Sequence, residues 1–322
     1  MQVSAGKIVV LGTGGTIAGK AGSAGDNIGY VAGQVGVQEL LEAVPGLMQA
    51  AQGPLQMEQV AQIDSKDMQF SVWSDLATRC LRYLADDTAR AIVITHGTDT
   101  LEETAWFLQS VLNATKPVVL TCAMRPATAM APDGPQNLLD AMAVATAPGA
   151  RGVLAVCAGV VHGARQVQKV HPYRVDAFSS GETGPLGWVE EGHVRWAEKS
   201  LPALCGRAPA ALEKIANGAP WPRVEIVMNY AGARGATVDA LVRDGVQGLV
   251  VAATGNGSVH HDLQAALERA QTAGVAVRVS TRCAQGQVLP RTGALLPLGH
   301  GLSPVKERVS LMLELLGGGT LA

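Results

Sequence analysis

The stretch that decides the fold lies at residues 7–19 and reads KIVVLGTGGTIAG. Its first half is a continuous apolar run, which is typical of a strand buried on both faces of a parallel sheet. A second stretch repeats the pattern at residues 91–104, AIVITHGTDTLEET. Both runs end in a turn rich in glycine and threonine. Because ligands in open parallel sheets bind beyond the carboxyl ends of the strands, both turns are expected to carry hydroxyl groups at a functional site.

The rest of the chain continues to alternate apolar runs with segments of helical periodicity. Further strands are predicted at residues 117–121, 152–156, 224–228, 248–252 and 275–279. Helices are predicted at residues 67–84, 101–112, 136–145, 261–273 and 305–316. This alternation predicts an α/β protein with mostly parallel sheets flanked by helices.

Two domains are expected in a chain of 322 residues. The alternation fails between about Gly192 and Pro222, where prolines and charged residues predict an irregular connection rather than a strand or a long helix. We expect a larger amino-terminal catalytic domain over residues 1–194, a linker over 195–215 and a smaller carboxyl-terminal α/β domain over 216–322.

Composition excludes several classes of protein. Apolar residues make up 48% of the chain and charged residues 16%, which excludes an extended disordered chain. A formal net charge of −2 gives no basic surface for nucleic acid, and no apolar run is long enough to span a membrane. No secretory signal precedes the first strand, so a cytoplasmic protein is expected. The five cysteines, expected to be reduced thiols without metal-ligand spacing, are Cys80, Cys122, Cys157, Cys205 and Cys283.

The glycine-rich turn at residues 12–19 has two nucleotide-binding interpretations that fit poorly. The third glycine of a dinucleotide-binding fingerprint would fall on Ile17. A phosphate-binding loop requires Gly-Lys-Ser/Thr, whereas residues 15–17 are Gly-Thr-Ile. The turn instead places Thr16 where backbone N–H groups can approach an acyl oxygen. A threonine hydroxyl becomes a nucleophile once a neighbouring base removes its proton.

Together, the two threonine stretches resemble the signature motifs of the bacterial-type L-asparaginases, which are amidohydrolases with a two-domain α/β fold. The resemblance implies that Thr16 attacks the amide carbon, and that Tyr30, in a glycine-rich segment at residues 27–36, closes over the substrate on a lid. It assigns Asp99 to the α-ammonium of the substrate. It also places Thr98 in a triad with Lys169, the last residue of the segment GARQVQK, in which the lysine would accept the threonine proton.

Further substrate-binding residues follow from the same resemblance. The family usually has Ser-Gln where this chain has Ser65-Lys66, a pair that holds the α-carboxylate. Lys66 would add a cation near that anion if it points inward, and otherwise points to solvent. Backbone amides near Thr16 and Thr98 would stabilise the oxyanion. The other residues implied to contact substrate are Gly15, Gly97, Ala123 and, in a loop that reaches a neighbouring subunit's site, Asn256 and Ser258.

Other chemically interesting residues have structural interpretations. Thr100, followed three residues later by Glu103, fits a capping box at a helix start. No serine or cysteine in an elbow motif partners His96, His162 or His171, so these histidines are interpreted as structural. Many relatives contribute a glutamate from the neighbouring subunit, but the corresponding stretch at residues 280–290 carries no acid. No catalytic role is assigned to that stretch.

The resemblance implies hydrolysis of L-asparagine to aspartate and ammonia through a threonyl acyl-enzyme, without a metal or an organic cofactor. It also implies a homotetramer built as a dimer of dimers, which acts on a small amino-acid amide and has no nucleic-acid or membrane partner. Three alternatives remain open. They are a glutaminase-asparaginase, an amidotransferase-type subunit working with a partner, and a non-catalytic amino-acid sensor on the same scaffold.

Overall fold

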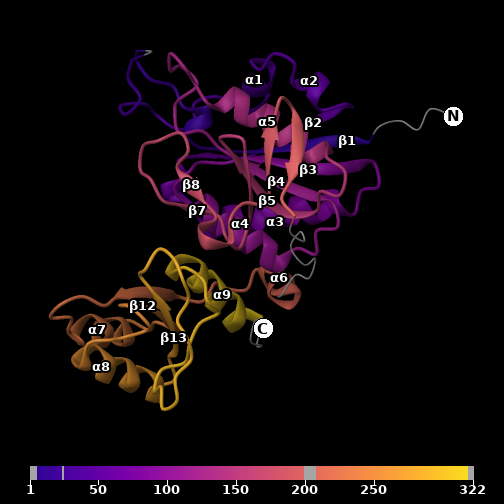
Figure 1. Ribbon diagram of the computed structural model, residues 1–322. Coiled ribbons are helices and arrows are strands. Elements are labelled where there is room, and N and C mark those ends of the chain that lie inside the picture. Colours follow the sequence, from indigo (N-terminus) through magenta and orange to yellow (C-terminus); the bar gives the residue numbers. More distant parts are fainter. Residues whose placement is uncertain (1–5, 24, 199–207, 318–322) are drawn as a thin grey trace. The chain divides into compact units, whose positions relative to one another are not determined.

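The chain divides into two compact units, Met1–Gly206 and Arg207–Ala322, each described here by itself. The computed structural model describes residues 6–23, 25–198 and 208–317 (Figure 1). Within them, the α/β architecture expected from the sequence is confirmed. Unit 1 contains a large mixed sheet and unit 2 a small parallel one.

The sheet of unit 1 has eight strands in the order β10-β9-β6-β5-β4-β3-β1-β2. The five neighbouring strands β5, β4, β3, β1 and β2 run parallel. Strands β6, β9 and β10 extend the sheet in antiparallel pairing. These antiparallel strands and the edge strand β2 were not predicted. The bounds are β1 (Lys7–Gly14), β2 (Leu55–Ile63), β3 (Ala89–Thr95), β4 (Pro117–Thr121), β5 (Gly152–Cys157), β6 (Val160–Gly163), β9 (Gly187–Glu190) and β10 (His193–Trp196), besides the pair β7 (Gln168–Lys169) and β8 (Phe178–Ser179).

Helices cover both faces of this sheet. Leu138 and Met142 of α5 (Gly134–Thr146) belong to one core cluster, which also includes Val93 and Val119 of the sheet and residues of α1 (Val37–Glu42) and α2 (Leu47–Ala50). Helix α3 (Phe70–Leu84) packs against β3, and α4 (Leu101–Val111) packs against β5. The ring of Trp73 in α3 stacks on that of Phe107 in α4, with ring centroids 4.9 Å apart. The carboxyl ends of β1 and β3 are therefore held rigidly between two helical layers.

Helix α3 begins three residues later than the sequence predicted. Residues Ser65–Asp67 form a 3-10 turn instead of the first helical turn. The carboxylate of Asp64 accepts a hydrogen bond from the amide of Lys66 and so caps this short turn. Local capping therefore competes with helix extension. The consequence is that Ser65 faces inward, where only 2% of it is exposed.

Unit 2 is a three-stranded parallel sheet with helices on both faces. Strands β11 (Val224–Met228), β12 (Gly248–Ala253) and β13 (Ala276–Thr281) pair in sequence order. Helices α7 (Ala236–Arg243) and α8 (His261–Thr272) share one core with Leu249 and Val251 of β12. Alternate residues of a strand face opposite sides, and a Cβ at Gly248 would lie 2.9 Å from Leu311 of α9 (Pro304–Gly317). Helix α9 therefore packs on the other face.

The expected irregular connection is only partly irregular. Strand β10 occupies residues His193–Trp196, and α6 covers Pro209–Ala216, so both ends of the expected linker are regular. A four-residue strand is too short to show alternation in the sequence. In α6 the proline sits at the first helical position, where it suits a helix start rather than a break. Residues 199–207 of the expected linker, with Cys205, lie outside the described residues.

A charged cluster ties the loop before α9 to that helix. His300 Nδ1 lies 2.8 Å from Glu307 Oε1, its backbone amide donates to Glu307 Oε2, and its Nε2 lies 3.1 Å from Glu314 Oε1. Both glutamates are buried. Hydrogen bonds to Glu307 and Glu314 raise the pKa of His300 from 6.5 to about 9. The cluster therefore stabilises unit 2 most when the imidazole is charged.

We predict that this cluster makes stability fall at alkaline pH. A raised folded-state pKa contributes stability that is fully present below the ordinary value and is lost as pH rises through about 9. The free energy of unfolding should drop by about 1–3 kcal/mol between pH 6.5 and 9.5 in urea titrations. His300→Gln should flatten this slope, whereas His261→Gln, at a position 84% exposed, should leave it unchanged. Equal slopes in wild type and His300→Gln would exclude His300 as the cause.

None of the helices in the described residues is long and apolar enough to cross a membrane. The longest, α3, has 15 residues, whereas a transmembrane helix needs about 20 apolar ones.

Candidate active site

Two glycines bring the two threonine loops together at the carboxyl ends of β1 and β3. A Cβ at Gly15 would lie 2.3 Å from the Cα of Gly97, and a Cβ at Gly97 would lie 2.4 Å from Ser65 Oγ. Gly15 also has a φ of +83°, a conformation that favours glycine. Only glycine therefore fits at either position. Thr16 and Thr98 each follow one of these glycines, so the contact brings both hydroxyl-bearing loops to one place.

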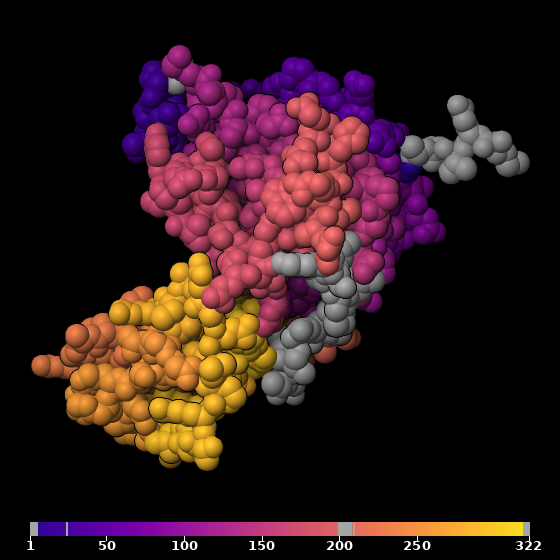
Figure 2. Space-filling view, viewed as in Figure 1, coloured from indigo at the N-terminus to yellow at the C-terminus, as the bar shows by residue number. Residues whose placement is uncertain are grey.

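Thr16 is paired with the tyrosine that the family resemblance placed on the lid. Its Oγ1 lies 2.6 Å from the phenolic oxygen of Tyr30, and either oxygen can donate. The lid segment returns to the body through a backbone bridge between Lys20 and Val31. A Cβ at Gly19 would lie 2.8 Å from the Tyr30 ring, so the ring packs directly on that turn. The segment itself lies at the surface of unit 1, where its indigo atoms are visible in Figure 2.

Thr98, Asp99 and Lys169 form a compact hydrogen-bonded set. Lys169 Nζ donates to Thr98 Oγ1 at 2.9 Å and to Asp99 Oδ1 at 2.6 Å. Only 17% of the Lys169 side chain is exposed, so it is not an ordinary solvated surface lysine. It comes from β7, 71 residues after Thr98 in the chain. The structure thus brings together the threonine and the lysine that the family resemblance assigned to one triad.

Ser65 holds the backbone of the loop that carries Thr98 and Asp99. Its Oγ accepts a hydrogen bond from the Asp99 amide at 3.1 Å, and its carbonyl accepts one from Thr100 Oγ1 at 2.8 Å. The second bond corrects a prediction. Thr100 is the N-cap residue of α4, but its hydroxyl makes no capping bond within the helix. The turn at Ser65–Asp67 lies beside the helix start, and the Thr100 hydroxyl donates to its carbonyl rather than accepting from the Glu103 amide.

Lys66 points back onto its own turn. Its ammonium lies 2.7 Å from Asp64 Oδ2 and 3.3 Å from Asp67 Oδ2, and 61% of the side chain is exposed. Hydrogen bonds to Asp64 and Asp67 raise its pKa. Two carboxylates therefore already neutralise this cation, and Ser65 is the member of the pair that faces the threonine loops.

The other residues that were predicted to bind substrate, Ala123, Gly15, Asn256 and Ser258, make contacts outside the Thr98–Asp99–Lys169 set. Ala123 is fully buried just after β4. The amide of Gly15 donates to the carbonyl of Ile63 at 2.8 Å, so this N–H group is committed to the fold rather than to an oxyanion. Asn256 and Ser258 belong to unit 2. Their contacts there are local: Asn256 pairs with the backbone of Leu289, and the Ser258 amide donates to the Thr254 carbonyl.

Two polar residues to which the sequence assigned no individual role hold the loop after β4. The carboxylate of Asp133 accepts the amides of Met124 and Arg125, both at 2.9 Å. Asn137 Nδ2 donates to the carbonyl of Cys122 at 2.9 Å. The Asp-Gly-Pro sequence at the start of α5 was a visible helix-start signal. The loop that the carboxylate holds was not visible, because it comes from another part of the chain.

His96 has the structural role that the sequence predicted. Its Nδ1 lies 2.7 Å from the Gly97 carbonyl and its Nε2 lies 2.9 Å from Thr104 Oγ1. Burial lowers the pKa of His96 to about 4, so the ring is neutral at pH 7. Nδ1–H therefore donates to the carbonyl and Nε2 accepts from the hydroxyl. The ring fixes the loop that carries Thr98, while His162 and His171 bond to Ser180 and to a local turn, respectively.

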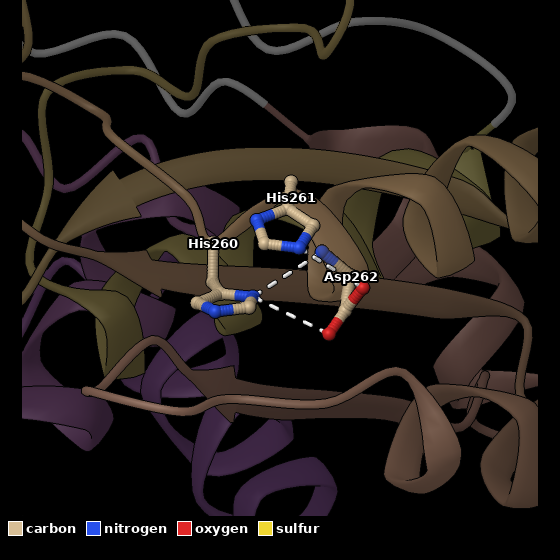
Figure 3. Close-up of side chains that lie close together, drawn as sticks. All are labelled: His260, His261 and Asp262. Carbon is tan, nitrogen blue, oxygen red and sulfur yellow. Dashed lines mark hydrogen bonds and ion pairs between the residues drawn. The ribbon is translucent and has the colours of Figure 1, made fainter.

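One group of residues in the described chain has the composition of a metal site. His260, His261 and Asp262 lie at the start of α8 in unit 2, with potential ligand atoms within 4.8 Å of one another (Figure 3). The amide of Asp262 donates to His260 Nδ1 at 3.2 Å, and the two rings stack. His260 is thus the cap of α8. A metal at Nδ1 would have to displace that bond, so we assign the group a capping role.

The arrangement in unit 1 is suited to acyl transfer. It offers one hydroxyl paired with a phenol, a second hydroxyl paired with an ammonium, and a carboxylate able to bind a cation. A nucleophile with an adjacent proton acceptor is the minimum that covalent amide hydrolysis requires.

Comparison with known proteins identifies relatives for both units. Residues 7–202 match the amino-terminal asparaginase domain, and residues 223–320 match the glutaminase/asparaginase carboxyl-terminal domain. L-asparaginase 2 of Escherichia coli (strain K12) is 38% identical, over 96% of this chain and 88% of that protein. Glutaminase-asparaginase of Pseudomonas fluorescens biotype A is 36% identical, over 96% of this chain and 86% of that protein. The crystal structure of a probable cytoplasmic L-asparaginase from Campylobacter jejuni matches with a TM-score of 0.90 at 36% identity, over 96% and 95%.

Proposed function

The chain belongs to the bacterial-type asparaginase family of amidohydrolases, and on that premise we propose that it hydrolyses L-asparagine through an acyl-enzyme on Thr16. One observation carries the proposal. The contact between Gly15 and Gly97 joins two loops, each with a threonine hydroxyl already paired, Thr16 with Tyr30 and Thr98 with Lys169. A binding protein without catalysis would have no use for two hydroxyls that are each paired with a side chain able to carry a proton.

Asparagine would bind first through its charged amino-acid end. Its α-ammonium pairs with the carboxylate of Asp99 and its α-carboxylate accepts from the hydroxyl of Ser65. Asp99 is also the ion-pair partner of Lys169, at 2.6 Å. The incoming ammonium competes for the same carboxylate, so substrate binding weakens the hold of Asp99 on Lys169. Lys169 is then directed to its other partner, Thr98.

The reaction then proceeds in two steps. Thr16 Oγ1 attacks the side-chain amide carbon, its proton leaves through Tyr30, and the C–N bond breaks as the nitrogen takes up a proton and departs as ammonia. Water next attacks the acyl-enzyme and releases aspartate, and Thr16 recovers its proton. In our proposal Thr98 and Lys169 relay the proton of that water. Dividing the hydrolysis this way replaces one difficult step by two easier ones.

We predict that asparagine is the preferred substrate and glutamine a much weaker one. Glutamine is longer by one methylene, and rejection of one methylene gives about 1–3 kcal/mol, or roughly 10–200-fold in kcat/KM. Ammonia release from L-asparagine, L-glutamine and D-asparagine measures this directly. Equal kcat/KM values for the two L-amides would make the protein a glutaminase-asparaginase, the second candidate, which the Pseudomonas relative's name favours. No ammonia from any amide at millimolar concentration would refute an amidohydrolase.

We also propose a cytoplasmic homotetramer, built as a dimer of dimers. The cytoplasmic assignment follows the description of the Campylobacter structure, although a Haemophilus influenzae relative is described as probably periplasmic. The tetramer follows the family resemblance, in which the loop with Asn256 and Ser258 reaches a neighbouring subunit's site. Sedimentation equilibrium would measure the assembly.

A further inference from the structure

Two buried cysteines touch each other behind the threonine loops. The Sγ atoms of Cys122 and Cys157 lie 3.2 Å apart, and both residues are free thiols. Only 1% of Cys122 and 4% of Cys157 is exposed. Neither thiol has a role in the proposed hydrolysis. Their contact arises because Cys122 directly follows β4 and Cys157 ends β5, its parallel neighbour.

The surrounding backbone holds the two thiols in this contact. In the β4–β5 ladder Thr121 pairs with Val156, and Thr121 Oγ1 also donates to the Val156 carbonyl at 2.9 Å. The side chain of Asn137 then bridges the next residues. Its Nδ2 donates to the Cys122 carbonyl and its Oδ1 accepts from the Ala158 amide, both at 2.9 Å. The two strand ends therefore cannot separate without breaking the Thr121 hydrogen bond and at least one of the two that Asn137 makes.

We propose that Cys122 and Cys157 are an oxidation site that forms a reversible disulfide linking β4 to β5 when the protein meets hydrogen peroxide. A disulfide needs an S–S distance of about 2.0 Å and neighbouring Cα atoms at about 4.4–6.8 Å. Adjacent strands lie about 4.8 Å apart, so the backbone spacing already suits the bond. The sulfurs need to approach by only about 1 Å, which side-chain rotation supplies.

The chemistry balances with peroxide as the only oxidant. One thiol loses its proton and attacks a peroxide oxygen, giving a sulfenic acid and a water molecule. The second thiol attacks that sulfur and expels the hydroxyl as a second water, so two thiols and one peroxide yield one disulfide and two waters. The hydrogen bond to Cys157 and burial raise the pKa of Cys122, so the thiolate is scarce at neutral pH. Oxidation should therefore be slow, and local opening should limit it.

The disulfide should stabilise unit 1 without stopping catalysis. It closes a loop spanning 35 residues, which restricts the unfolded chain. We expect the melting temperature to rise by on the order of 5 °C. Because Asn137 and Thr121 already fix the backbone, Ala123 and the turn after β5 should keep their positions. The value of kcat should then stay within about two-fold, since no reacting group moves.

The test begins with the reduced full-length protein. It is incubated with hydrogen peroxide, denatured, alkylated with N-ethylmaleimide and analysed by intact mass and peptide mapping. We expect one crosslinked peptide pair containing Cys122 and Cys157, a raised melting temperature, and reversal of both by dithiothreitol. Mapping of the unaltered chain does not depend on any variant folding.

Two variants sharpen the comparison. Cys157→Ala should abolish the peroxide-dependent rise in melting temperature, whereas Cys283→Ser, which removes an exposed thiol, should preserve it. The proposal is overturned if both Cys122 and Cys157 still react with N-ethylmaleimide after peroxide and denaturation. It is equally overturned if the crosslink joins another cysteine, if the thiols only gain oxygen atoms, or if the rise persists in Cys157→Ala.

Discussion

Thr16→Val is expected to lower kcat for asparagine by about 10⁴-fold or more, the largest effect of any single substitution in this chain. Thr16 is 6% exposed and its hydroxyl lies 2.6 Å from Tyr30. Valine keeps the shape of threonine and removes only the nucleophilic oxygen, so the site loses its covalent step rather than its packing. Steady-state ammonia release measures kcat, and rapid-quench mass spectrometry should detect an acyl adduct on wild type and none on Thr16→Val.

Thr16→Ser is the matched control, because it retains the hydroxyl and deletes one methyl group. It should keep far more activity than Thr16→Val, with kcat lowered by about 10-fold at most. The melting temperatures of both variants should stay close to that of wild type. If Thr16→Val kept kcat within 10-fold of wild type, the nucleophile would have to be another residue, and Thr98 would be the next to test.

Strands and helices buried in the core could be predicted because their pattern is local. Residues 8–11 and 91–94 are uniformly apolar, and the structure buries both within the sheet. Strand β2 was missed because polar residues interrupt it throughout, so it has neither a continuous apolar run nor a strict alternation, and all its residues are at least partly exposed. Strands β6, β9 and β10 have four residues each, too few to show a period. Tertiary pairing, rather than local propensity, makes these segments strands.

The candidate site divides in the same way. Thr16 and Thr98 stood out locally, since each follows a glycine after an apolar strand. Lys169 did not, because its contact with Thr98 spans 71 residues and only the family resemblance selected it. The contact between Cys122 and Cys157 was invisible for the same reason: strand register creates it. The side-chain direction of Lys66 could not be predicted, because it depends on how the 3-10 turn places the carboxylates of Asp64 and Asp67 around the ammonium.

Lys169→Met is expected to lower kcat by roughly 10²–10⁴-fold while changing KM little. Its ammonium donates to Thr98 Oγ1 at 2.9 Å, so methionine removes the amine that is proposed to exchange a proton with that hydroxyl. A group that acts on proton transfer affects the transition state more than the bound substrate. Thr98→Val should show a loss of similar size, and the double variant should be little worse than either, because the two residues act as one unit. Additive losses would separate them into independent roles.

Asp99→Asn should raise KM more than it lowers kcat, because Asp99 is proposed to bind the α-ammonium rather than to move a proton. Losing a charge-assisted hydrogen bond of this kind costs about 1.5–3 kcal/mol, so KM should rise by roughly 10–150-fold.

Lys116→Met serves as the matched control for Lys169→Met, since Lys116 donates to the Asp86 carbonyl and takes no part in the site. A few-fold or smaller change in kcat for Lys169→Met, similar to that for Lys116→Met, would remove Lys169 from the mechanism. A large KM effect in Lys169→Met instead would mean that the lysine binds substrate, and that Asp99 and Lys169 act together on the amino-acid end.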